Sequence, residues 1–200
     1  MEIFFTSDLH FNHDKEFLWG PRGFKSSEEH DAAVIRNWNE TVGNDDVVYV
    51  LGDIMMGADY ELGLKKLSQL NGTIIIIKGN HDTDTKFEKY LACPNVSEET
   101  KFDTLAKIIK VGKWRFYASH RPTIVDHLQR DRHGEKESGS QKEPKSFGVH
   151  GHTHSNNKFE YIEFCCYNVS LDAHNCRPVS AAQIKEDIKK YLADMRENEI

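Results

Sequence analysis

The strongest constraint on the fold is an apolar run that ends abruptly in polar side chains. Isoleucine occupies each of residues 74–77, and the chain then turns within three residues to Gly79, Asn80, His81 and Asp82. A continuous apolar run bounded by turn residues is typical of a strand that is covered on both faces. An ordinary surface turn does not need a glycine, an amide, an imidazole and a carboxylate together. The sequence therefore predicts a buried strand that delivers chemically active side chains to one edge of a sheet.

Short apolar runs alternate with helical patterns along the first half of the chain. Either Ser26 or Ser27 is expected to cap the first long helix, because a serine hydroxyl accepts hydrogen bonds from the first amides of a helix. Continuous apolar strands that are separated by helices imply a layered α/β architecture. The predicted strands are residues 2–7, 46–53 and 72–80, and the predicted helices are residues 27–42 and 59–70.

The pattern changes after about residue 100 to closely spaced strands, which are expected to form hairpins in a mixed sheet or in two packed sheets. An amphipathic helix is predicted near the end of the sequence, with Ile184, Ile188 and Leu192 on one stripe. Breaker residues fill 126–147, which predicts a flexible loop or insertion, more simply a solvated excursion than a substrate lid. Residues 1–200 are expected to form one domain. The predicted elements of this half are strands at 104–111, 113–120, 146–152 and 167–171 and a helix at 179–198.

Composition narrows the class of protein. Apolar residues make up 38% and charged residues 29% of the chain, and no apolar run approaches the twenty or so residues of a membrane helix. The first residues have no basic region or cleavage site of a signal peptide. The four cysteines lack paired spacing, which favours reduced thiols and the cytoplasm. A net charge of −6 opposes binding of a long nucleic acid.

Seven potential metal ligands occur where predicted strands end. In open α/β sheets, ligands bind in the crevice outside the carboxyl ends of the strands. Carboxylates mixed with imidazoles suit Mn²⁺, Fe²⁺ or Zn²⁺ better than Ca²⁺. Seven donors are too many for one ion with an open position, whereas two ions about 3.5–4 Å apart that share a carboxylate would use them. The seven residues are Asp8, His10, Asp53, Asn80, His120, His152 and His154.

The motifs that carry these residues resemble, in their order, the calcineurin-like metallophosphoesterase superfamily. They are SDLH, LGD, GNHD, ASH and HGHTH, and they extend from residue 8 to 154. The segments NWNETVGNDDVVYVLGD and YNVSLDAHNCRPVS resemble small bacterial and phage members. The resemblance implies an α/β (α+β) fold: a four-layer αββα sandwich of two mixed sheets flanked by helices, with the metal site at the carboxyl ends of the strands.

The resemblance also implies a role for each ligand. Asp8, His10, Asp53 and His154 would hold one divalent ion, and Asp53, Asn80, His120 and His152 the other, so that Asp53 bridges the two. Mn²⁺ is the expected ion, with Fe²⁺, Zn²⁺, Ni²⁺ or Mg²⁺ as alternatives. His81 would contact the scissile phosphate or its leaving oxygen, and Asp82 would orient the ring of His81. Gly79 permits the tight turn out of the strand.

The implied activity is hydrolysis of a phosphodiester or nucleotide by a water that two metals activate, with His81 as general acid. A small phosphoester or nucleotide is the expected substrate. The alternatives are a nuclease acting on short DNA or RNA, a phosphomonoesterase, and a non-catalytic metal-binding scaffold. The sequence carries no signature of oligomeric state.

Five further residues are weaker candidates for substrate binding. Asn12 and His13 follow the first motif closely, and Arg22 has the planar guanidinium that clamps phosphates. His174 and Arg177 follow a strand that is expected near the site. Each has a competing structural explanation as a loop or packing residue.

Overall fold

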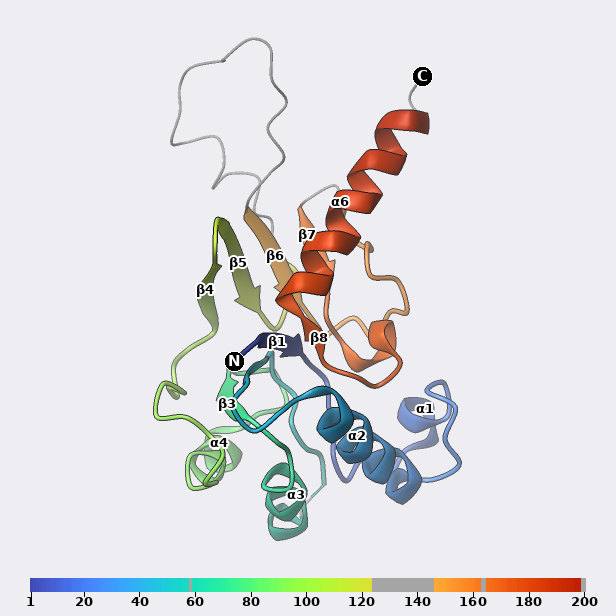
Figure 1. The fold of residues 1–200 in the computed structure, drawn as a ribbon. Helices are drawn as coiled ribbons and strands as arrows, with labels where there is room; N and C mark the ends of the chain where they lie inside the picture. Colours follow the sequence, from blue (N-terminus) through green and yellow to red (C-terminus); the bar gives the residue numbers. More distant parts are fainter. Residues whose placement is uncertain (58, 124–145, 163–164, 199–200) are drawn as a thin grey trace.

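The computed structural model describes residues 1–57, 59–123, 146–162 and 165–198, and two four-stranded sheets form its centre (Figure 1). In the first sheet three parallel strands are joined by an antiparallel edge strand, in the order β3-β2-β1-β8. These strands are β1 (Ile3–Thr6), β2 (Val47–Val50), β3 (Thr73–Ile76) and β8 (Val179–Ser180).

The second sheet has the order β4-β5-β6-β7. Its strands are β4 (Ala106–Val111), β5 (Trp114–Ser119), β6 (Ser146–His150) and β7 (Cys166–Asn168). Only β4 and β5 form the expected hairpin, whereas β5, β6 and β7 run parallel. The expectation of successive hairpins was therefore wrong. A two-residue turn joins β4 to β5, whereas the longer segments after β5 and β6 allow the chain to cross back to the same end of the sheet.

The strands of the first sheet are apolar on both faces, so helices cover one face and the second sheet covers the other. The helices are α1 (Glu16–Trp19), α2 (Ser27–Thr41), α3 (Tyr60–Leu67), α4 (Asp84–Tyr90), the 3₁₀ helix η2 (Leu171–His174) and α6 (Ala181–Asn198). Ser26 caps α2, since its hydroxyl accepts a hydrogen bond from the amide of Glu29 at 3.2 Å. Among the described elements, α1, α4, η2 and β8 were not predicted, because each is too short to show a clear periodicity.

Alternation along β3 explains its unbroken isoleucines. Ile74 and Ile76 face the helices, in a buried cluster that includes Trp38 of α2. Ile75 and Ile77 face the second sheet, in a cluster that includes Phe116 of β5. Successive residues of a strand point to opposite faces, so four consecutive apolar residues can all be buried only in a layered protein.

The helix α6 packs against β8 and the core between the sheets (Figure 1). Ile184 and Ile188 are fully buried there, and Leu192 packs against the same cluster, which confirms the predicted stripe. Asp187 fixes the helix from its polar side, because its Oδ2 accepts hydrogen bonds from the Tyr167 hydroxyl at 2.5 Å and from Lys158 at 3.0 Å.

The predicted α/β class with two mixed sheets and flanking helices is confirmed. Of the predicted loop at 126–147, residues 126–145 lie outside the described residues, while Ser146 and Phe147 belong to β6 and not to a loop. Phe147 is buried between the sheets, and this burial holds the start of β6 in the sheet. Among the described helices, none is long and apolar enough to cross a bilayer.

The packing of β3 predicts a large difference between two isoleucines. Ile75→Ala should lower the free energy of unfolding by about 2–5 kcal/mol, because it leaves a cavity between the sheets. Ile108→Ala on β4 should cost less than about 1 kcal/mol, since 54% of Ile108 is exposed. Urea denaturation of both variants measures the difference. Equal losses would contradict the assignment of residue 75 to the core.

Candidate metal centre

The carboxyl ends of the parallel strands meet at one edge of the molecule. The amide of Asp8 donates to the carbonyl of Gly52 at 3.1 Å, and the amide of His10 donates to the carbonyl of Asp53 at 3.0 Å. A bridge between Ser7 and Ser170 links the two sheets at the same edge. The backbones approach so closely that a side chain at Gly151 would collide with Ser7 and Asp8.

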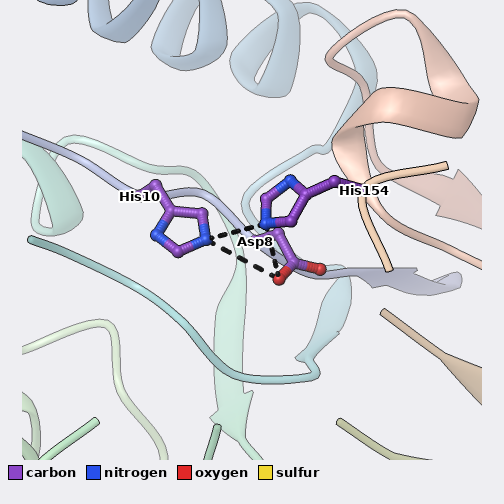
Figure 2. Close-up of side chains that lie close together, drawn as sticks. All are labelled: Asp8, His10 and His154. Carbon is purple, nitrogen blue, oxygen red and sulfur yellow. Dashed lines mark hydrogen bonds and ion pairs between the residues drawn. The ribbon is translucent and has the colours of Figure 1, made fainter. Parts of the chain in front are cut away.

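One group of donors consists of Asp8, His10 and His154 (Figure 2). The Nε2 atoms of the two imidazoles are 3.2 Å apart, and they lie 3.8 Å (His10) and 3.7 Å (His154) from Asp8 Oδ1. This oxygen is buried, and no described residue donates a hydrogen bond to it. Because a buried carboxylate oxygen without a partner is costly, it points to a cation at this position.

A second group of donors consists of Asp8, Asp53 and His120. Asp53 Oδ2 lies 3.4 Å from His120 Nε2 and 3.7 Å from His10 Nε2, so this carboxylate reaches both groups. Asn80 Oδ1 and His152 Nδ1 lie 2.8 Å and 3.2 Å from His120 Nε2. The structure thus brings all seven predicted donors together.

In two of the imidazoles, His120 and His154, Nδ1 contacts a protein oxygen, and this contact orients Nε2 toward the other donors. His120 Nδ1 donates to the carbonyl of Leu51 at 2.7 Å, so in the neutral imidazole Nε2 carries the lone pair. That lone pair faces the carbonyl oxygen of the Asn80 side chain, which is also an acceptor. His154 Nδ1 lies 3.0 Å from Asp172 Oδ2, which leaves its Nε2 to face His10. Acceptors crowded around a common point fit divalent cations.

Burial sets the protonation of the donors. It lowers the pKa of His10 well below the ordinary value, with a further contribution from the neighbouring His154, so this imidazole is neutral and its lone pair is available. Asp53 is only 2% exposed, and this burial raises the pKa of its carboxyl because the ionised form is poorly solvated. A cation beside Asp53 would favour its ionised form.

The backbone is strained where the donors leave the strands. Nine described residues other than glycine have positive φ, and six of them belong to this region, with φ between 49° and 70°. Such conformations cost about 1–3 kcal/mol each and concentrate at functional sites. The six residues are Asp8, His10, Asn12, Asp53, His152 and His154.

Comparison with known proteins identifies the family. The family model described as the calcineurin-like phosphoesterase superfamily domain matches residues 1–168. The chain belongs to this superfamily. The resemblance of its motifs is thereby confirmed, while the prediction that residues 1–200 form a single domain stays a prediction.

Two relatives and one solved structure show how far the similarity extends. An uncharacterized protein from Methanocaldococcus jannaschii is 29% identical over 94% of this chain and 92% of its own length. The gene 66 protein of Mycobacterium phage L5 is 31% identical over 76% of each chain. A protein of unknown function from Aquifex aeolicus has a TM-score of 0.65 at 20% identity and covers 92% of this chain and 98% of its own, which shows the shared fold.

His81 of this phosphoesterase domain lies beside the donors without being one of them. Its amide donates to Asp53 Oδ1 at 2.9 Å, and its exposed ring meets the ring of His10 edge-on, with centroids 5.7 Å apart. Asp82 does not hydrogen-bond that ring, contrary to expectation. Its Oδ2 accepts from the amides of Asp53 at 2.8 Å and Gly79 at 2.9 Å, because the strand ends leave these amides without other partners. Asp82 therefore fixes the backbone that carries His81.

Arg22 is not a phosphate clamp in this structure. Its side chain is 1% exposed, and two of its nitrogens donate to the two oxygens of Asp172 at 3.0 Å and 2.7 Å. Arg22 also donates to the carbonyl of Asp8 at 3.0 Å and to His30 Nε2 at 2.9 Å. With its hydrogen-bond donors occupied, Arg22 supports the candidate ligands Asp8 and His154.

Of the remaining candidates, only Asn12 and His13 lie next to the site. The ring of His13 meets that of His10 edge-on at 5.6 Å. The side chain of Asn12 is held by Lys66 and by the carbonyl of Asp59.

His174 and Arg177, which were expected to bind substrate, make hydrogen bonds within the fold. His174 Nε2 donates to the carbonyl of Asn168 at 2.9 Å, because the turn of η2 brings the ring back over β7. Arg177 donates to Asn37, Glu40 and Thr41 at the end of α2. Both therefore have structural roles.

Sequence reasoning missed three residues around the donors. Asp172 holds His154, and Lys86 donates to the carbonyl of His81 at 3.0 Å. The exposed Arg121 donates to His152 Nε2 at 2.8 Å. Arg121 directly follows His120, which was a usable signal, whereas Asp172 and Lys86 lie in segments without a metal motif.

The contact between Asp172 and His154 predicts a second role for this carboxylate. Burial alone would raise its pKa, but hydrogen bonds from His154 and Arg22 hold the pKa of Asp172 well below its usual range. Asp172→Asn should therefore weaken Mn²⁺ binding by about 10–100-fold, as loss of a hydrogen bond behind a ligand typically does. Titration calorimetry measures the affinity. Asp187→Asn, which removes a partly exposed ion pair with Lys158, is the control and should leave the affinity unchanged. Equal effects would contradict the role.

His174 predicts a pH-dependent stability. Burial lowers the pKa of His174 to about 4, below the value of about 6.5 in an unfolded chain. The neutral ring therefore stabilises the fold above pH 6.5, and this contribution is lost as the pH falls toward 4. Between pH 7.5 and 5, the wild type should lose about 2 kcal/mol more than His174→Gln. Urea denaturation at both pH values measures the losses, and identical losses would contradict the assignment.

Proposed function

We propose that this chain is a metal-dependent phosphohydrolase, specifically a phosphodiesterase or nucleotide phosphoesterase with a dinuclear metal centre. The observation that carries the proposal is the position of Asp53, whose Oδ2 lies within 3.7 Å of imidazole nitrogens from both donor groups. Asp8 also belongs to both groups. Shared carboxylates between two sets of imidazoles are what two cations about 3.5–4 Å apart require.

The proposed ligand sets follow the two groups of donors. Mn²⁺ is the proposed ion, because the donors are oxygens and imidazoles without a thiolate, and Fe²⁺, Zn²⁺, Ni²⁺ or Mg²⁺ share this preference in part. When bound, the two ions supply Lewis acidity toward the phosphoryl oxygens and lower the pKa of water. One ion would be held by Asp8, His10, Asp53 and His154, and the other by Asp53, Asn80, His120 and His152.

His81 is the proposed general acid. Its ring is exposed at the mouth of the site, while its backbone is fixed through the hydrogen bond to Asp53. From this place the imidazole can donate a proton to the leaving oxygen, a contribution of about 10²–10⁴-fold in rate.

Two buried side chains position His81 through its backbone. Lys86 Nζ donates to the carbonyls of His81 at 3.0 Å and Met55 at 2.9 Å. Asp82 binds the amide of Gly79, at the start of the turn. The turn is thus held at both of its ends, so the ring stays beside the donors while its edge remains open to a substrate.

The proposed substrate is a small phosphoester or nucleotide. The net charge of −6 disfavours a long polyanion, whose binding depends on neutralisation by basic side chains. The proposed compartment is the cytoplasm, with which the buried thiols of Cys93 and Cys176 are consistent.

Hydrolysis of bis-p-nitrophenyl phosphate and p-nitrophenyl phosphate, each in Mn²⁺ and in EDTA, tests the proposal. We expect Mn²⁺-dependent cleavage that favours the diester and is abolished by EDTA. A preference for the monoester would instead make the chain a phosphomonoesterase. Two bound metals without cleavage of either ester would favour a non-catalytic scaffold.

Two variants separate acid catalysis from metal binding in the same assay. His81→Ala should retain both metals and lose about 10²–10⁴-fold in turnover. Asp53→Ala should lose the metal pair, since it removes the shared carboxylate. Metal content is measured by elemental analysis beside the rates. Full activity in either variant would refute the mechanism.

A further inference from the structure

A cavity of about 330 Å³ lies beside the metal centre. Its walls come from three segments that are distant in sequence: residues 21–24, the loop after His154 at Asn156, and residues 171–176 around η2. This volume is at the lower end of the range for small-molecule sites, which is about 300–1,000 Å³.

The cavity begins one side chain away from a metal ligand. Asp172 and Arg22 both line it. The same two side chains contact His154 Nδ1, at 3.0 Å from Asp172 Oδ2 and at 3.4 Å from Arg22 Nη2. The pair of Arg22 and Asp172 is therefore all that separates the imidazole of His154 from the cavity.

The groups available in the cavity are neutral. Arg22 and Asp172 form a buried pair with each other, so neither offers an unpaired charge. Asn156 and Asn175 are exposed, and their side-chain amides make no hydrogen bond to the described residues. A carboxamide both donates and accepts hydrogen bonds. Phe24 and Ala173 supply apolar wall, so the cavity suits a neutral, hydrogen-bonding group.

Backbone strain extends from the metal centre to this cavity. Asn175 and Cys176 both line it and have φ of 51° and 55°. Together with the six residues at the donors, they account for eight of the nine positive-φ residues other than glycine in the described chain. Strain of this kind persists where a particular side-chain geometry is needed.

We propose that this cavity binds the organic group of the substrate, a neutral hydrogen-bonding group such as the base or the sugar of a nucleotide. Asn156 and Asn175 form its hydrogen bonds while the phosphate lies at the metal donors. The assignment rests on the proposed function, which it deepens by naming the substrate class and two specificity-determining residues.

Binding of phosphonates, whose carbon–phosphorus bond resists hydrolysis, tests the proposal in the full chain with Mg²⁺. We expect the phosphonate analogue of AMP to bind at least about tenfold more tightly than methylphosphonate, as two additional hydrogen bonds allow. Ribose 5-phosphonate distinguishes the sources: affinity equal to that of the AMP analogue assigns the cavity to the sugar, and affinity equal to methylphosphonate assigns it to the base.

The variants Asn156→Ala and Asn175→Gly remove the two amides, and glycine retains the positive φ at position 175. Together they should reduce the preference for the AMP analogue over methylphosphonate to within about twofold. Asn44→Ala, which alters an exposed asparagine before β2 at the opposite ends of the strands, is the matched control and should keep the preference. An undiminished preference in the double variant would overturn the proposal.

NMR spectra of the side-chain amides separate failure of the cavity from failure of the metal centre. Adenosine, which has no phosphate, should shift the Asn156 and Asn175 amide signals whether or not phosphonates bind the metals. Shifts with adenosine combined with no binding of phosphonates would refute the proposed function alone. If neither adenosine nor ribose at millimolar concentration shifts these signals while methylphosphonate binds, the cavity proposal is wrong and the metal centre stands.

Discussion

The structure depends on the close approach of the two sheets at Gly151. There the chain leaving β6 passes against Ser7 and Asp8, with no room for a side chain. Asp8 Oδ2 accepts hydrogen bonds from the Ser7 hydroxyl at 2.6 Å and from the amide of His152 at 2.9 Å. One carboxylate thus joins the first sheet to the second, while its other oxygen accepts no hydrogen bond from the residues that the structure describes. The junction between the sheets and the metal centre are consequently the same place.

This arrangement explains why strain is tolerated at the donors. Each positive φ is unfavourable on its own, but the conformation is fixed by hydrogen bonds that strand ends would otherwise leave unmade. Asp82 shows the principle, because its carboxylate accepts from the amides of Asp53, Ile54 and Gly79 and from the hydroxyl of Tyr90. The surrounding core is apolar, so loss of these bonds would leave buried amides unsatisfied. Packing therefore holds the donors in place before any ion binds.

The sequence predicted the donors because each follows a strand directly. Parallel strands end at the same edge of a sheet, so side chains that are distant along the chain, such as Asp8 and Asp53, had to meet. The contact of Arg22 with Asp172, which holds the donor His154, could not be predicted in this way. Arg22 and Asp172 are 150 positions apart, and neither the loop of the first nor the short helix of the second carries a periodic pattern. The structural hydrogen bonds of His174 and Arg177 could not be predicted for the same reason, since nothing in the sequence showed where the chain turns after β7.

The segment after β7 connects the ligand support to the cavity. Asp172 faces His154 on one side and lines the cavity on the other, with Arg22 held between the carbonyl of Asp8 and Asp172. A change in this segment would alter both the orientation of His154, a candidate metal ligand, and the wall of the cavity. Asn175 and Cys176 follow within four residues, where positive φ turns the chain back toward β8. Substrate selection by the cavity would thus be coupled to ligand geometry through a single buried ion pair, without any movement of the strands.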